Sequence, residues 1–157
     1  MTAVHSLPPV RKQVVIDAPQ AHCFKVFAEE TTRWWPSAHH IGKTPMTKAI
    51  IENREGGRWY STHEDGSEVD TGSVRVWDPP RRIVLVWRIN ADWQYDPTLD
   101  TEVEVTFTPD GLSRTVVVLE HRNLDRFGAK ADELRQGIDS EGGWGMFLTN
   151  LKAASET

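Results

Sequence analysis

The sequence predicts an α+β fold in which an antiparallel sheet of six to seven strands is covered by a C-terminal helix. Six stretches of strand-like composition follow one another between residues 47 and 123, and only short turn sequences separate them. Short connections favour antiparallel neighbours, because parallel strands need long crossovers. Residues 141–156 instead repeat apolar side chains with the period of a helix. A run of strands followed by a helix is typical of the α+β class.

A strand and a helix precede the run of strands. Residues 11–18 (RKQVVIDA) are rich in β-branched side chains and stop at Pro19, which predicts a strand. Residues 17–30 predict a helix, because proline suits a first helical turn and Phe24 and Phe27 recur on one face.

The six later strands are expected to alternate between a buried and a solvent-exposed face. Residues 101–109 show this most clearly, since Val103 and Val105 point to one side while Glu102 and Glu104 point to the other. Such a sheet is covered on one face and wet on the other. The predicted strands are residues 47–54, 57–64, 70–78, 82–90, 101–109 and 113–123.

The C-terminal segment supplies the cover. Residues 141–156 (EGGWGMFLTNLKAASE) predict an amphipathic helix, and residues 125–140 before it predict a polar loop with a short helix. The apolar stripe of the C-terminal helix consists of Trp144, Phe147, Leu148 and Leu151.

Length, charge and cysteine content narrow the class of protein. The 157 residues predict a single domain, residues 1–157. A formal net charge of −5 with scattered basic residues argues against a nucleic-acid partner. No secretion signal and no membrane-spanning apolar run is visible, so we expect a cytoplasmic protein without membrane insertion. The single cysteine, Cys23, lies in the predicted helix and is interpreted as a buried thiol.

The unusual feature of the composition is seven tryptophans beside two tyrosines and five phenylalanines. By strand alternation Trp59, Ser61 and His63 share one face, Trp87 faces inward from another strand, and Trp144 lies on the inward stripe of the last helix. Convergent aromatic side chains with a few polar groups are typical of a pocket for an apolar ligand. The alternative is that these tryptophans only fill the core.

The histidines do not predict a metal site or an active site. His39 and His40 are adjacent, whereas zinc ligands prefer a spacing that puts them on one side of an element. His63 and His121 have carboxylates beside them in sequence, yet no nucleophile motif accompanies either. Phosphate-loop and dinucleotide fingerprints are absent, so the sequence predicts neither a metal nor a cofactor.

Four stretches of the chain resemble a known family. They are IDAPQAHCFKVF, GGRWYSTHEDGSEVDTGSVRVWDPPRRIVLVW, TEVEVTFTPDGLSRTVVVLEH and GGWGMFLTNL, which together run from about Val14 to Leu151. They resemble the START-like (SRPBCC, helix-grip) superfamily, and within it the branch named after the activator of the heat-shock chaperone ATPase. The resemblance implies a curved sheet wrapped around a long C-terminal helix, with a cavity between the two for an apolar small molecule.

Sequence and resemblance together predict a small-molecule binding protein. The expected cavity residues are the tryptophans of the wall, with two histidines as polar groups: Trp34, Trp35, Trp59, Trp87, Trp144, His63 and His121. One alternative is an enzyme that acts on an apolar cyclic substrate as a cyclase, aromatase or hydrolase, with His63 or His121 as the acid–base residue. Another is a protein-interaction module or homodimer. A chaperone partner is not expected, because the resemblance covers only the C-terminal part of the co-chaperone.

Overall fold

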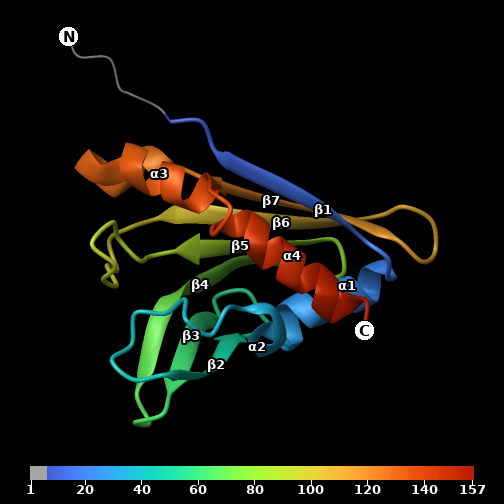
Figure 1. The fold of residues 1–157 in the computed structure, drawn as a ribbon, viewed down its shortest axis with the longest axis horizontal. Coiled ribbons are helices and arrows are strands. Elements are labelled where there is room, and N and C mark those ends of the chain that lie inside the picture. The colour runs from blue at the N-terminus through green and yellow to red at the C-terminus, as the bar shows by residue number, and fades with distance from the viewer. Residues whose placement is uncertain (1–6) are drawn as a thin grey trace.

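Seven antiparallel strands form one curved sheet in the order β1-β7-β6-β5-β4-β3-β2 (Figure 1). The structure is a computed structural model that describes residues 7–157. The strands are β1 (Val10–Ile16), β2 (Met46–Ile51), β3 (Arg58–His63), β4 (Glu68–Asp78), β5 (Arg82–Trp87), β6 (Thr101–Pro109) and β7 (Thr115–Arg122). The predicted α+β class is confirmed, and each predicted strand is present with slightly different ends.

The helical elements comprise two helices after β1 and three segments at the C-terminus. They are α1 (Gln20–Glu29), α2 (Thr31–Trp34), the 3-10 segment η1 (Leu124–Lys130), α3 (Ala131–Asp139) and α4 (Trp144–Ser155). Figure 1 shows α4 lying across the face of the sheet, with α1 near its C-terminal end. The short helix α2 was not predicted. None of the helices between residues 7 and 157 is long and apolar enough to cross a membrane.

The sheet alternates as the sequence predicts. In β6, Val103 and Val105 are at most 1% exposed. On the opposite face Glu102 and Glu104 accept hydrogen bonds from Arg122 of the neighbouring strand β7. The meander therefore buries one face against the helices and pairs charges on the other.

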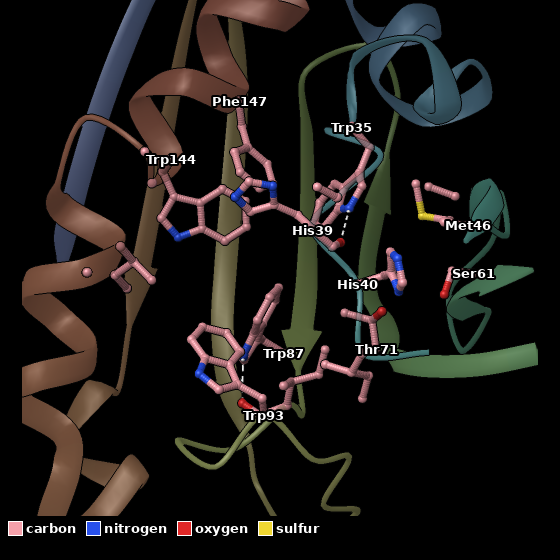
Figure 2. A pocket seen from close by; sticks show the side chains of 18 of the residues that line it. Trp35, His39, His40, Met46, Ser61, Thr71, Trp87, Trp93, Trp144 and Phe147 are labelled. Carbon is pink, nitrogen blue, oxygen red and sulfur yellow. Dashed lines mark hydrogen bonds between the residues drawn. The ribbon is translucent and has the colours of Figure 1, made fainter. Parts of the chain in front are cut away.

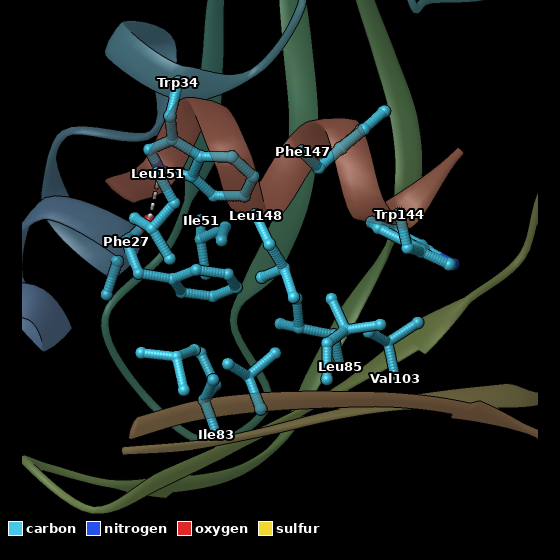
Figure 3. Close-up of a cluster of buried hydrophobic side chains, with 14 of the residues drawn as sticks. Phe27, Trp34, Ile51, Ile83, Leu85, Val103, Trp144, Phe147, Leu148 and Leu151 are labelled. Carbon is cyan, nitrogen blue, oxygen red and sulfur yellow. Dashed lines mark hydrogen bonds between the residues drawn. The ribbon is translucent and has the colours of Figure 1, made fainter. Parts of the chain in front are cut away.

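The core lies between the sheet and α4 (Figure 3). The predicted stripe of α4 is buried, and Leu148 and Leu151 pack toward Ile83, Leu85 and Val103 of the sheet. Burying a side chain of this size contributes roughly 1.5–3 kcal/mol. This stripe therefore holds the C-terminal helix on the sheet.

The long C-terminal helical region is bent between α3 and α4. A side chain at Gly143 would place its Cβ 2.1 Å from the carbonyl oxygen of Ile138, so the chain can turn back this closely only at a glycine. The bend allows α3 and α4 to contribute separate walls to the space beside the sheet.

Candidate functional site

A cavity of about 380 Å³ lies between the inner face of the sheet, the C-terminal helices and the 35–41 loop. Its volume falls within the roughly 300–1,000 Å³ that is typical of small-molecule sites. Figure 2 shows the side chains that line it. The central wall residues are Trp35, His39, His40, Met46, Ser61, Thr71, Trp87, Trp93, Trp144 and Phe147.

Four tryptophans form a closed ring of edge-to-face contacts on the cavity wall. Trp59 and Trp87 come from β3 and β5, and their ring centroids are 5.5 Å apart. Trp144 of α4 lies 5.8 Å from Trp87. Trp35 follows α2 and closes the ring, with centroids 5.8 Å from Trp59 and 6.3 Å from Trp144. Tilted aromatic pairs at these distances are mutually attractive, so the wall is rigid before any ligand arrives.

His121 of β7 fixes two of these tryptophans from behind the wall. Its Nδ1 accepts a hydrogen bond of 3.1 Å from the indole N–H of Trp144. Because indole can only donate, the proton of the neutral ring is on Nε2, which donates to Thr101 Oγ1 at 2.9 Å. The Thr101 hydroxyl in turn donates to the carbonyl oxygen of Trp87 at 3.1 Å. The chain of hydrogen bonds thus connects α4 with β5.

The environment of His121 keeps the ring neutral. Its side chain is 1% exposed, and burial lowers its pKa from 6.5 to about 3. Both ring nitrogens are occupied by protein groups, so the ring has no free position for a substrate. In this arrangement His121 holds Trp144 directly and the backbone of Trp87 through Thr101, and its burial does not favour the alternative of an acid–base role.

His63 lies at the other end of the cavity and supports Ser61. The ring is 3% exposed, its Nδ1 lies 2.9 Å from the carbonyl oxygen of Thr44, and its Nε2 lies 2.8 Å from Ser61 Oγ. Ser61 lines the cavity whereas His63 does not. The expected polar group at this position is thus the serine hydroxyl, with the histidine one step behind it.

A β-bulge adds a second hydroxyl near Ser61. In the β3–β4 pair, Trp59 is opposite Gly72 and Tyr60 is opposite Asp70, which leaves Thr71 as the extra residue. Bulges re-aim side chains, and the Thr71 side chain lines the cavity. In Figure 2 Ser61, Thr71 and His40 lie on one side of the cavity, and Trp144 and Phe147 lie on the other. The cavity therefore has an aromatic end and a polar end.

Trp34 is a core residue and not part of the cavity wall. It is 3% exposed, stacks on Phe27 with centroids 4.8 Å apart, and donates its indole N–H to the carbonyl oxygens of Val26 and Phe27. The backbone leaves the helix at Trp35, where φ and ψ are −70° and 124°. Adjacent side chains at a helix end diverge, so only Trp35 reaches the cavity.

The structure thus places the predicted site residues in two groups. Trp35, Trp59, Trp87 and Trp144 line the cavity. The remaining three, Trp34, His63 and His121, lie behind its wall. His39 and His40 lie in a loop that lines the cavity. Within residues 7–157, no group of three or more His, Cys, Asp or Glu side chains is arranged to hold a metal ion.

Trp93 and Thr71 are two of the cavity residues that the sequence reasoning did not identify. Trp93 belongs to the β5–β6 connection, which the sequence marks only as a turn, and it is 57% exposed with a positive φ of 59°. A left-handed backbone is unusual for a large side chain, but only the structure shows it. The sequence offered as a signal no more than a tryptophan within a turn segment. Thr71 has no comparable signal, because a bulge cannot be read from strand alternation. Cys23 is fully buried, and burial raises the pKa of its thiol.

Comparisons with known proteins agree with this architecture. A family model described as activator of Hsp90 ATPase homolog 1-like protein matches residues 17–156. The structure of an anthrahydroquino-gamma-pyrone synthase, Txn09, is similar with 36% identity, over 95% of this chain and 97% of that one, and a TM-score of 0.66. The self-sacrificing resistance protein CalC from Micromonospora echinospora is 32% identical over 94% of both chains, also with a TM-score of 0.66.

A more distant structure extends the likeness in fold alone. CalU16 from Micromonospora echinospora is 21% identical over 96% of this chain and 81% of that one, with a TM-score of 0.58. No curated protein sequence matches the chain.

Proposed function

The chain belongs to the family of activator of Hsp90 ATPase homolog 1-like proteins, and we propose that it binds a planar, fused-ring aromatic molecule in its tryptophan-lined cavity. The fold is that of the START-like (SRPBCC) superfamily, a ligand-binding fold. The proposal concerns which class of ligand this cavity takes.

The closed ring of tryptophans is the observation that carries the proposal. Trp35, Trp59, Trp87 and Trp144 present flat faces and edges around one space, and each is held by contacts with two others. Aromatic faces and edges favour flat aromatic partners through offset stacking and edge contacts. A flexible aliphatic chain would gain the same burial and none of this geometric preference.

The polar end supports a ligand with oxygen atoms on one edge. Ser61 and Thr71 place hydroxyl groups in a wall that is otherwise dominated by apolar side chains. A few polar groups in an apolar pocket fix the orientation of the ligand. A fused-ring molecule with oxygen-bearing substituents at one edge fits both the aromatic end and the polar end of the cavity.

The relatives give independent support for this ligand class. One protein that is 36% identical is described as a synthase of an anthrahydroquino-gamma-pyrone, whose name denotes a fused aromatic ring system. Chains that are this similar over nearly their full length commonly share the form of their binding site. The synthase activity itself belongs to that protein.

Titration with a fused-ring probe tests the proposal. We expect 2-hydroxyanthraquinone to quench the intrinsic tryptophan fluorescence with saturable binding at a one-to-one ratio by calorimetry. Ala49 lines the cavity from β2, whereas its neighbour Ile50 points to the other face. Ala49→Phe should therefore abolish binding and Ile50→Phe should preserve it, with both folds checked by circular dichroism. Equal binding by both variants would place the probe elsewhere and contradict the proposal.

A further inference from the structure

We propose that Ser61 and His63 form a proton relay that binds a phenolic hydroxyl of the ligand and makes it more acidic. This inference rests on the proposed function, because it concerns the polar end of the same cavity. It assigns the chemical group that the ligand must present there.

The direction of the hydrogen bonds determines what Ser61 can accept. The carbonyl oxygen of Thr44 can only accept, so His63 Nδ1 carries a proton and donates to it. In the neutral ring Nε2 is then an acceptor, and the Ser61 hydroxyl donates its only proton to Nε2 at 2.8 Å. The lone pairs of Ser61 Oγ are left for the cavity. The ligand atom that meets them must therefore be a donor, which a phenolic hydroxyl is and a ketone oxygen is not.

The two relay residues are buried, and packing fixes the orientation of the His63 ring. Ser61 and His63 are 7% and 3% exposed, so neither is a solvated surface group. A Cβ at Gly42 would lie 2.4 Å from His63 Cε1 and 2.7 Å from its Nε2, which shows that the 42–44 backbone lies directly against the ring. The ring of His40 is 4.9 Å away on the cavity side. This packing holds Nε2 in line with the serine.

The relay transfers two protons in sequence, one from the ligand to Ser61 and one from Ser61 to His63. The ligand O–H bond breaks as its proton passes to Ser61 Oγ, while the original Ser61 proton passes to His63 Nε2. The products are a phenolate, an intact serine hydroxyl that now donates to it, and an imidazolium whose Nδ1–H still donates to Thr44. No electrons are exchanged, and the net charge of the site is unchanged.

Burial and the relay shift the pKa of the bound phenol in opposite directions, so the effect of the relay can be measured. An apolar cavity disfavours a charged phenolate, so burial alone raises the pKa of a bound phenol. An adjacent imidazolium and a donating hydroxyl lower it. The other titratable residues that line the cavity are His39, His40, Tyr60 and Glu133, and the ring of Tyr60 packs against Arg58 on the other face of β3. A His40→Gln control is therefore needed, because that ring is the one nearest to His63.

Two probes of equal size separate the relay from apolar binding. 2-Hydroxyanthraquinone has the phenol, and 2-methylanthraquinone replaces it by a methyl group. We expect the wild-type protein to bind the hydroxy probe about three- to tenfold more tightly, the range for one well-placed hydrogen bond. Ser61→Ala should remove this preference. Thr62→Val removes a hydroxyl from the opposite face of the same strand and should leave it unchanged.

The visible spectrum of the bound hydroxy probe reports its ionisation directly. We expect its pKa to be lower when bound to the wild-type protein than in water, and higher than in water when bound to His63→Gln. His63→Gln also serves where Ser61→Ala fails to fold. A lowered pKa of the bound probe that is lost in His40→Gln and kept in His63→Gln would overturn the relay. Equal affinity for both probes, or a raised pKa in the wild-type complex, would overturn the relay while leaving the proposed function standing. Failure of both probes to bind would overturn the two proposals together.

Discussion

Replacement of His121 by leucine tests the hydrogen-bonded support behind the aromatic wall. The leucine side chain fills a similar volume and removes both hydrogen bonds of the ring. The indole N–H of Trp144 then has no partner in a buried position, while the Thr101 hydroxyl keeps its bond to the Trp87 carbonyl. The variant therefore isolates one orphaned donor and one lost hydrogen bond.

The expected cost follows from these two terms. A buried unsatisfied donor costs about 1–3 kcal/mol, and loss of an ordinary hydrogen bond costs about 0.5–1.5 kcal/mol. The apolar leucine recovers part of this by its own burial. We expect a decrease of about 2–3 kcal/mol in the free energy of unfolding at pH 7, which corresponds to a Tm lower by roughly 4–12 °C for a chain of this size.

The stability difference between wild type and His121→Leu should depend on pH. The pKa of His121 is 6.5 when the ring is free and about 3 in the fold, so the unfolded state binds more protons between these values. The contribution of the neutral His121 ring to the free energy of unfolding is present in full above pH 6.5. It decreases as the pH drops through this window, by up to about 1.4 kcal/mol per pH unit. Between pH 7 and pH 5 the wild type loses about 2 kcal/mol that His121→Leu does not lose. The two proteins should therefore become nearly equal in stability at pH 5.

Urea unfolding at pH 7 and pH 5, followed by circular dichroism, measures both terms. The carboxylates are common to wild type and variant, so their titration cancels in the difference. Trp144→Phe provides a double-mutant cycle, because without the indole N–H the leucine at position 121 should cost less by about 1–2 kcal/mol. A difference between wild type and variant that stays constant with pH would refute the neutral buried ring. Additive effects in the cycle would refute the Trp144 hydrogen bond.

Three further predictions concern the backbone at Gly72, the exposed cavity residue Trp93 and the core residue Trp34. Gly72→Ala should cost more than about 3 kcal/mol in urea unfolding, because its Cβ would lie 1.6 Å from the Val86 carbonyl oxygen. Gly145→Ala in α4 places its Cβ in open space and should stabilise the protein by about 0.5–1 kcal/mol. Similar effects of the two substitutions on stability would contradict the close approach of the Val86 carbonyl to Gly72. Trp93→Ala should speed dissociation of the probe severalfold in stopped-flow fluorescence and change stability by less than about 0.5 kcal/mol. Trp34→Phe should lower stability by about 1 kcal/mol and leave the probe Kd within about twofold, and a larger affinity loss would return Trp34 to the cavity wall.

The elements of the fold could be predicted because their signals are local. Alternation within a strand such as residues 101–109 and the stripe from Trp144 to Leu151 depend only on backbone periods of two and 3.6 residues. The same alternation correctly placed Trp59 and Trp87 on the inner face, where they now line the cavity. Side-chain direction within a regular element is therefore readable from the chain itself.

The site required distances between segments that lie far apart in the chain. His121 and Trp144 are 23 residues apart, and their hydrogen bond decides the tautomer of the ring, while burial between the distant segments keeps the ring neutral. The bulge that turns Thr71 inward depends on pairing with β3, and no property of residue 71 reveals it. Polar partners of a buried group are chosen by tertiary proximity, which a single sequence does not contain.

By itself the sequence determined the α+β class, the strands, the covering helix and a set of inward tryptophans. Only the tertiary structure decided that Trp35 belongs to the cavity and adjacent Trp34 to the core. It also placed Ser61 on the cavity wall, with His63 and His121 behind that wall. The physical reason is that backbone periodicity sets which face a side chain points to, whereas packing and hydrogen bonding between distant segments set what it meets there.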